Sequence, residues 1–166
     1  MKNLVVYYSL SGNTEIVAKE IGRAAGGELR RISEVRPPKG AGIFFATVSG
    51  IFGGKSSLAP MDFSFHEYDN IFVGGPVWAG RSTPAINAFL DKADFTGKKV
   101  YLFLTQGGQS KPKGIFRSMA ARVRSRGGTV AGSIYIRAAG KSSLSQVIVK
   151  PIDAWIKKIG VTAETK

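Results

Sequence analysis

Short apolar runs alternate with amphipathic stretches along most of the chain, and this alternation restricts the possible folds more than any other feature of the sequence. Apolar runs rich in β-branched and aromatic residues predict strands that are buried on both faces. Such runs occupy residues 4–8, 28–33, 70–74, 98–105 and 129–136. Apolar residues at helical spacing predict helices at 14–25, 85–92, 112–126 and 144–159, the last one broken or kinked at Pro151.

Strands that alternate with helices predict an α/β fold, in which a parallel sheet carries helices on both faces. The second strand contains Arg30 and Arg31, so we expect it near an edge of the sheet. The length of 166 residues is that of one domain, 1–166. The segment 75–84 is rich in Gly and Pro and predicts a loop, whereas 36–65 gives no clear pattern beyond room for one short helix.

The composition excludes several kinds of site. The chain has no Cys, which rules out disulfides, iron–sulfur clusters and a catalytic thiol. The single His66 has acidic neighbours but forms no triad or metal-binding pattern, so we expect no metal and no catalytic side chain. The N-terminal apolar run is too short for a secretory signal, and no run could span a bilayer. We therefore expect a cytoplasmic protein that does not act at a membrane.

The loop after the first predicted strand is the strongest candidate for a binding site, because ligands of parallel sheets bind beyond the carboxyl ends of the strands. This loop contains Ser9, Leu10, Ser11, Gly12, Asn13 and Thr14. Its hydroxyls and amide could add donors to the free N–H groups of a helix N-terminus, which bind anions. The loop lacks the Lys of a nucleotide-binding P-loop, so it favours a monophosphate. An ordinary helix cap explains the same residues.

The sequence Ser-x-Ser-Gly-Asn-Thr after an apolar strand resembles the FMN-phosphate loop of the flavodoxins. Residues 74–80, Gly-Gly-Pro-Val-Trp-Ala-Gly, followed by Pro84, resemble the loop after the third strand of small flavodoxin-like proteins, and residues 104–108 resemble the loop after their fourth strand. The resemblance implies a flavodoxin-like three-layer sandwich whose five-stranded parallel sheet has the order 2-1-3-4-5, with non-covalent FMN as the cofactor. The implied cofactor-binding residues are Ser9, Leu10, Ser11, Gly12, Asn13, Thr14, Pro76, Val77, Trp78, Ala79, Gly80, Thr105, Gln106, Gly107 and Gly108.

The second and third loops would hold the flavin ring in this interpretation. Trp78 could stack on the ring, and a place in the core is the less favoured explanation because Pro76, Gly80 and Pro84 mark the segment as a loop. Gly80 would permit a peptide flip that offers a carbonyl to the reduced ring, and residues 105–108 could aim backbone N–H groups at its oxygens. The two glycines there also fit a simple turn.

Two departures from the flavodoxin pattern concern the faces of the ring. Ala79 follows Trp78 where related loops often carry a second aromatic residue, and the third loop has no aromatic residue. One face of the ring would then be open, or covered by Phe44, Phe45 or Phe52. An open face would let a second substrate stack on the ring, which favours a reductase over a simple carrier.

The net charge of +13 is the largest departure, because flavodoxins that act as carriers are typically acidic. No acidic residue lies between Asp94 and Asp153, a stretch with eleven Lys and Arg residues. Such a field attracts anionic partners, although a solvated basic surface explains it too. No motif that reads nucleic acid is present, so we expect no nucleic-acid partner.

These observations lead to one leading function and two alternatives. The leading one is an FMN-binding redox protein that transfers electrons to a partner protein or a small-molecule acceptor, with anionic partners favoured. The first alternative is an FMN-dependent NAD(P)H:quinone-type reductase. The second is a flavin-free module that uses the same fold to bind an anionic partner.

Overall fold

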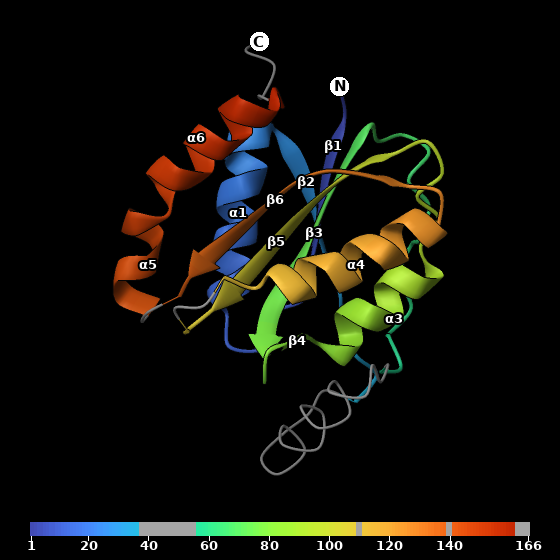
Figure 1. Ribbon diagram of the computed structural model, residues 1–166, viewed down its shortest axis with the longest axis horizontal. Coiled ribbons are helices and arrows are strands. Elements are labelled where there is room, and N and C mark those ends of the chain that lie inside the picture. Colours follow the sequence, from blue (N-terminus) through green and yellow to red (C-terminus); the bar gives the residue numbers. More distant parts are fainter. Residues whose placement is uncertain (37–55, 109–110, 139–140, 162–166) are drawn as a thin grey trace.

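The computed structural model describes residues 1–36, 56–108, 111–138 and 141–161, which form an α/β sandwich (Figure 1). The strands are β1 (Asn3–Tyr7), β2 (Gly27–Arg31), β3 (Asn70–Trp78), β4 (Arg81–Ser82), β5 (Lys99–Gln106) and β6 (Thr129–Arg137). The helices are α1 (Asn13–Ala25), α3 (Pro84–Lys92), α4 (Lys113–Ser125), α5 (Lys141–Val147) and α6 (Val149–Ile159). The predicted alternation of strands and helices is confirmed, with small shifts at the ends of elements.

The sheet has the order β2-β1-β3-β5-β6, and all four pairs along this path are parallel. Apart from the two-residue β4, these strands number one to five along the chain, so the predicted order 2-1-3-4-5 is confirmed. The arginine-bearing β2 lies at one edge, as expected. The carboxyl ends of the parallel strands therefore meet at one edge of the sandwich, where the three loops that the sequence singled out begin.

Helices cover both faces of the sheet: α1, α5 and α6 lie on one side and α3 and α4 on the other (Figure 1). Successive side chains of a strand point to opposite faces. Accordingly, Val5 and Tyr7 of β1 belong to the core under α1 and α6, whereas Leu4 and Val6 belong to the core under α3 and α4. The apolar runs of the central strands are thus buried on both sides, which fixes the loops at their ends.

Strand β3 is longer than the sequence suggested, because the expected loop 75–84 begins as strand. Residues 75–78 continue β3, and β4 pairs with Val77 and Trp78 in an antiparallel hairpin. Pro76 fits here because the pairing of β3 with β1 ends at Gly74, so no neighbouring strand requires a donor on that side. The assignment of Pro76, Val77 and Trp78 to a loop was therefore wrong, and only Ala79 and Gly80 form the turn.

The C-terminal helix is divided, although not at the proline itself. The chain forms α5 and α6, which meet at Ile148, and Pro151 lies in the first turn of α6. The first turn of a helix needs no intrahelical donor, so a proline is tolerated there.

In the described ranges, no helix combines the length and the apolar character that crossing a bilayer requires. Phe44, Phe45 and Phe52 lie outside the described residues.

Candidate functional site

Hydrogen bonds and a ring contact bring the three predicted loops together at the carboxyl edge of the sheet. The Tyr8 backbone N–H donates to the carbonyl of Gly74 at 3.0 Å, which ties the first loop to β3. The Tyr8 ring meets Trp78 edge to face, with 6.1 Å between the ring centroids. The hydroxyls of Thr14 and Thr105 share a hydrogen bond of 2.7 Å, which ties the start of α1 to the end of β5. Residues far apart in sequence thus surround one region.

The first loop is shaped by the buried hydroxyl of Ser9. Its Oγ accepts hydrogen bonds from the backbone N–H groups of Gly12 at 3.1 Å and Glu15 at 3.3 Å. Gly12 has a φ of 94°, a left-handed conformation that favours glycine, and it directly precedes α1. Ser9 therefore satisfies an N–H group in the first turn of α1, although the N-cap position is Gly12 and has no side-chain cap.

Asn13 carries an unsatisfied polar atom at the start of α1. Its Oδ1 is buried and has no hydrogen-bond partner among the described residues. A buried polar atom without a partner costs about 1–3 kcal/mol, and a ligand that reached it would remove that cost. Ser11 and Leu10 beside it are exposed. The loop therefore combines a free amide end, an accessible hydroxyl and the positive end of a helix dipole.

Arg31, at the end of β2, supports the first loop from outside. Its guanidinium donates to the carbonyl of Ser9 at 2.9 Å and to the carboxylate of Glu15 at 3.0 Å. Lys19 binds the same carboxylate at 2.8 Å. The hydrogen bond from Lys19, with the nearby Arg31, lowers the pKa of Glu15, so this group stays ionised. The negative charge of this acid in the first turn of α1 is thus paired with two cations. From the sequence, Arg31 was expected only to mark a strand at the edge of the sheet, so its role beside the first loop was not predicted.

Tyr8 follows β1 and fixes the base of the site. Its hydroxyl donates to the carboxylate of Glu34. Burial, followed by this hydrogen bond, raises the pKa of Tyr8 far above its ordinary value, so the phenol remains protonated. Tyr8 therefore serves as a neutral aromatic support for the half-buried indole of Trp78.

The hairpin turn beside Trp78 consists of Ala79 and Gly80, which have φ values of 45° and 72°. Positive φ at both central residues is the geometry of a tight two-residue hairpin. Ala79 is the one residue other than glycine with positive φ in the described part of the chain, so this turn stores backbone strain. Both turn residues are exposed, and a Cβ on Gly80 would meet nothing within 4 Å.

The third predicted segment divides into a strand end and an open turn. Thr105 and Gln106 belong to β5 and pair in register with Ile136 and Arg137 of β6. The expected loop therefore starts at Gly107, because the strand runs further than its apolar residues indicated. A Cβ on Gly107 or on Gly108 would meet nothing within 4 Å, so the space in front of this turn is open.

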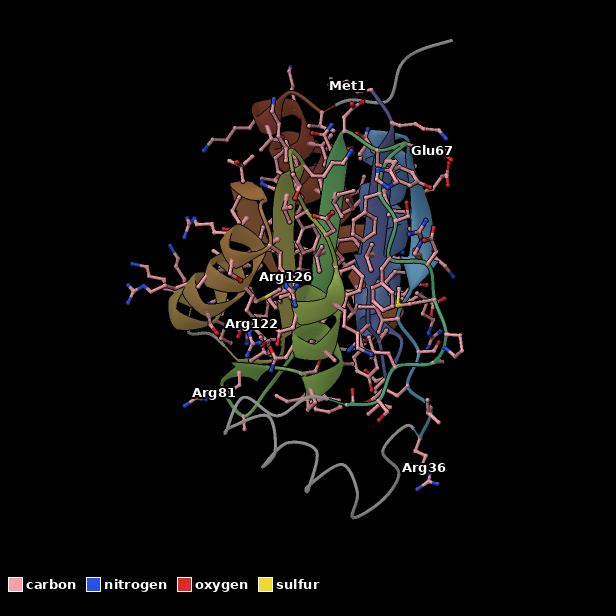
Figure 2. All side chains as sticks on the ribbon, turned by 90° about the vertical axis from the view of Figure 1, so that its right-hand side faces the viewer. Met1, Arg36, Glu67, Arg81, Arg122 and Arg126 are labelled. Atoms are coloured by element: carbon pink, nitrogen blue, oxygen red, sulfur yellow. The ribbon has the colours of Figure 1, made fainter. Side chains whose placement is uncertain are left out.

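A cavity of about 450 Å³ lies beside the hairpin, between the ends of β3 and β5 and the starts of α3 and α4. Of the predicted site residues, it includes Val77, Gly80 and Gln106. The sequence analysis did not place the remaining lining residues in the site: Arg81, Ser82, Asn87, Lys111, Pro112, Lys113, Gly114, Ile115, Ser118 and Arg122. In Figure 2, Arg81 and Arg122 lie on the same side of the molecule. The predicted residues of the first loop do not line this cavity.

His66 stands apart from these features. It is exposed and precedes β3, at the edge of the sheet opposite the loops. Its neighbour Glu67 lies at the other end of the molecule from Arg81 (Figure 2). Within the described ranges, no group of His, Asp and Glu side chains could hold a metal ion.

Comparisons with known proteins agree with this architecture. The sequence pattern of the family described as flavodoxin matches residues 52–128. A putative flavoprotein from Bacteroides eggerthii DSM 20697 superimposes with a TM-score of 0.79, at 24% identity over 97% of this chain and 99% of that one. The chain has a flavodoxin-like fold. A search of the curated proteins gives no match.

Two further structures extend the comparison of this flavodoxin-like chain. A flavoprotein from Lactobacillus acidophilus NCFM, solved in complex with FMN, has a TM-score of 0.68 and 25% identity, over 81% of this chain and 92% of that one. A flavodoxin, WrbA-like protein from Agrobacterium tumefaciens has a TM-score of 0.65 and 14% identity, over 98% of this chain and 99% of that one. The family match includes the hairpin and the cavity but not the first loop, whose assignment as an anion site rests on its geometry.

Proposed function

We propose that this protein binds FMN non-covalently and transfers electrons through it. The observation that carries the proposal is the first loop, where Asn13, whose Oδ1 is buried and has no partner among the described residues, and the exposed Ser11 stand at the N-terminus of α1. The flavodoxin pattern and the FMN complex of the Lactobacillus flavoprotein support the choice of ligand.

The residues of the first loop fit a phosphate monoester. Neutral donors would come from Ser11, Asn13 and Thr14 and from the first N–H groups of α1. In the structure, Oδ1 of Asn13 occupies the buried, unpartnered position. A flip of the side-chain amide would bring its NH₂ group there, and this group would donate a hydrogen bond to an anion. The acid nearest to this place, Glu15, already has two cationic partners. The loop therefore offers hydrogen-bond donors to a phosphate, and the negative charge of its nearest acid is already paired.

The residues around the hairpin and the third turn fit a flat ring. Trp78 offers an indole whose edge contact with Tyr8 holds it in place. Gly107 and Gly108 leave open space, so their backbone can approach a ligand closely. The turn at Ala79 and Gly80 brings exposed peptide groups to the same region. Bound there, FMN supplies reversible electron transfer, and the protein's part is to position the ring and exclude competing reactions.

A specific observation favours the reductase as a second candidate. The cavity of about 450 Å³ touches Gly80 and Gln106, which also belong to the predicted ring contacts, so a second small molecule has room beside the ring. An electron carrier does not need such a space. The NAD(P)H:quinone-type reductase therefore remains an alternative to the carrier, and a flavin-free anion-binding module remains the third possibility. A cytoplasmic location is part of the proposal, and cell fractionation tests it.

Titration of the purified protein with FMN and with riboflavin tests the proposal. FMN should bind with one site per chain, and Asn13→Ala and Ser11→Ala should weaken FMN far more than riboflavin, because each lost hydrogen bond to a charged group is worth about 1.5–3 kcal/mol. Ser145→Ala, at an exposed position of α5, is the matched control and should change neither affinity. Equal losses for the two ligands would show that the loop does not hold the phosphate.

A kinetic assay separates the reductase from the carrier. FMN-loaded protein is mixed with NADH or NADPH and a quinone, without any second reductase. Steady turnover supports the enzyme, whereas turnover that appears only after a separate reductase is added supports the carrier.

A further inference from the structure

The cavity beside the hairpin is lined by four cationic side chains, three of which have no ion-pair partner among the described residues. Arg81, Lys111 and Lys113 line it and are exposed, and no Asp or Glu is among its lining residues. Across the described ranges, these three side chains take part in no ion pair. Arg122 completes the wall and differs from them, because it is paired with Asp91 of α3. Like charges held together without a counter-charge repel one another, which a bound anion relieves.

The cavity also has apolar and neutral polar walls. Val77, Pro112 and Ile115 provide the apolar part, and Ser82 and Ser118 add hydroxyls. A volume of about 450 Å³ lies in the range of small-molecule sites, and such sites combine apolar walls with a few polar groups that orient the ligand. This composition suits a ring-sized apolar body that carries a negatively charged group.

The cations define the charged group further. The planar guanidinium of Arg81 matches a carboxylate in a two-pronged arrangement, and the lysines add point charges. The start of α4 lies at the same wall, with no side-chain cap and no acid in its first turn, so its dipole adds to the positive potential. All of these features favour an oxyanion over a neutral or cationic ligand.

We infer that this cavity binds a small organic carboxylate, with the carboxylate at Arg81, Lys111 and Lys113 and the apolar body against Val77, Pro112 and Ile115. That this ligand lies next to a cofactor rests on the proposed function, because Gly80 and Gln106 are shared with the predicted ring contacts. The binding of the carboxylate itself does not depend on the cofactor.

Calorimetric titration with 2-naphthoate and with 2-naphthamide tests the inference, because the two probes share their shape and differ in charge. The full-length protein is titrated alone and after saturation with FMN. We expect naphthoate to bind roughly tenfold more tightly than the amide in both cases. Equal affinities would overturn the inference. If FMN abolished naphthoate binding, the cavity would be part of the cofactor's own site and the inference would also fail.

Charge variants assign the binding to this cavity. Lys111→Gln combined with Lys113→Gln should weaken naphthoate roughly tenfold and leave naphthamide unchanged. Lys157→Gln combined with Lys158→Gln removes the same charge from exposed positions of α6, and it should change naphthoate binding less than about twofold. An equal loss in this control would mean that the overall field of the protein, rather than the cavity, attracts the anion.

A single variant separates the cavity from its smaller neighbour. Lys111 and Lys113 also border a hollow of about 330 Å³ against β6, which Arg81 does not reach. Arg81→Gln should therefore weaken naphthoate several-fold if the larger cavity is the site. No effect of Arg81→Gln would overturn the assignment. FMN binding is measured separately. If the protein did not bind FMN but still bound naphthoate, only the proposed function would be refuted.

Discussion

At the first loop, the nearby cations are already engaged within the protein, whereas at the cavity beside the hairpin they are not. Arg31 binds the carbonyl of Ser9 and the carboxylate of Glu15, so it holds the shape of the loop. Arg81 and Lys113 have no such partners among the described residues and face a cavity. The first region therefore depends on geometry and neutral donors, and the second on cations without an ion-pair partner among the described residues. The two regions should respond differently to mutation.

The largest effect is expected at the glycine beneath the first loop and the hairpin. A Cβ on Gly74 would lie 2.4 Å from the ring and from the carbonyl oxygen of Phe103 in β5. Gly74→Ala should lower the free energy of unfolding by roughly 2–3 kcal/mol, because the strands cannot separate to make room. Gly107→Ala is the matched control at an open position and should leave stability unchanged. Urea denaturation measures both, and a stable Gly74→Ala variant would show that β3 and β5 can shift.

The next effect concerns Arg31. Arg31→Met removes the bonds to Ser9 and Glu15 and should cost about 1 kcal/mol of stability, since the side chain is partly exposed. FMN affinity should fall as well, because the loop loses its external support. Arg117→Met, at an exposed position of α4, removes the same charge and should affect neither quantity. Thermal unfolding and flavin fluorescence quenching are the measurements. An unchanged FMN affinity would mean that the contacts of Arg31 with the loop do not contribute to FMN binding.

A smaller effect of opposite sign is expected at the hairpin that borders the cavity. Ala79 has a φ of 45°, which costs an alanine more than a glycine. Ala79→Gly should raise the free energy of unfolding by about 0.5–1 kcal/mol, whereas Gly80→Ala, at a φ of 72°, should lower it by a similar amount. Denaturation midpoints distinguish the two variants, and equal midpoints would indicate that the turn relaxes to another conformation.

The smallest effect is a pH dependence at the first loop. The pKa of Glu15 lies below its ordinary value of 4.5 because Lys19, with Arg31, stabilises the carboxylate. The folded protein therefore gains stability from this group above about pH 4.5, and that gain is lost as the pH falls through the lowered pKa. Glu15→Gln should thus be less stable than the parent at pH 7, and this difference should shrink as the pH falls below about 4.5. A constant difference across this range would exclude the ion pairs as its cause.

The sequence predicted the fold well because the apolar runs of the central strands are buried on both faces, which makes their pattern easy to read. It predicted the end of β3 poorly, since Pro76 and the adjacent glycines suggested a loop, and only the pairing of strands reveals a free edge there. The residues of the first loop were predicted from their order along the chain. The cavity was not, because Arg81, Asn87 and Lys113 come from separate elements and only the packing of α3 and α4 brings them together.

The hydrogen bond between Thr14 and Thr105 contains a single hydrogen between two oxygens, and either oxygen can supply it. The hydroxyl that accepts this hydrogen bond keeps its own hydrogen, with which it can donate a second hydrogen bond to a third group. A negatively charged neighbour of Thr14 would therefore turn Thr105 into the donor of the pair, and the same neighbour beside Thr105 would reverse the direction. This exchange needs only rotation about two C–O bonds, without movement of the backbone. The direction of the Thr105 hydroxyl at the end of β5 can therefore depend on whether an anion lies beside Thr14 at the start of α1.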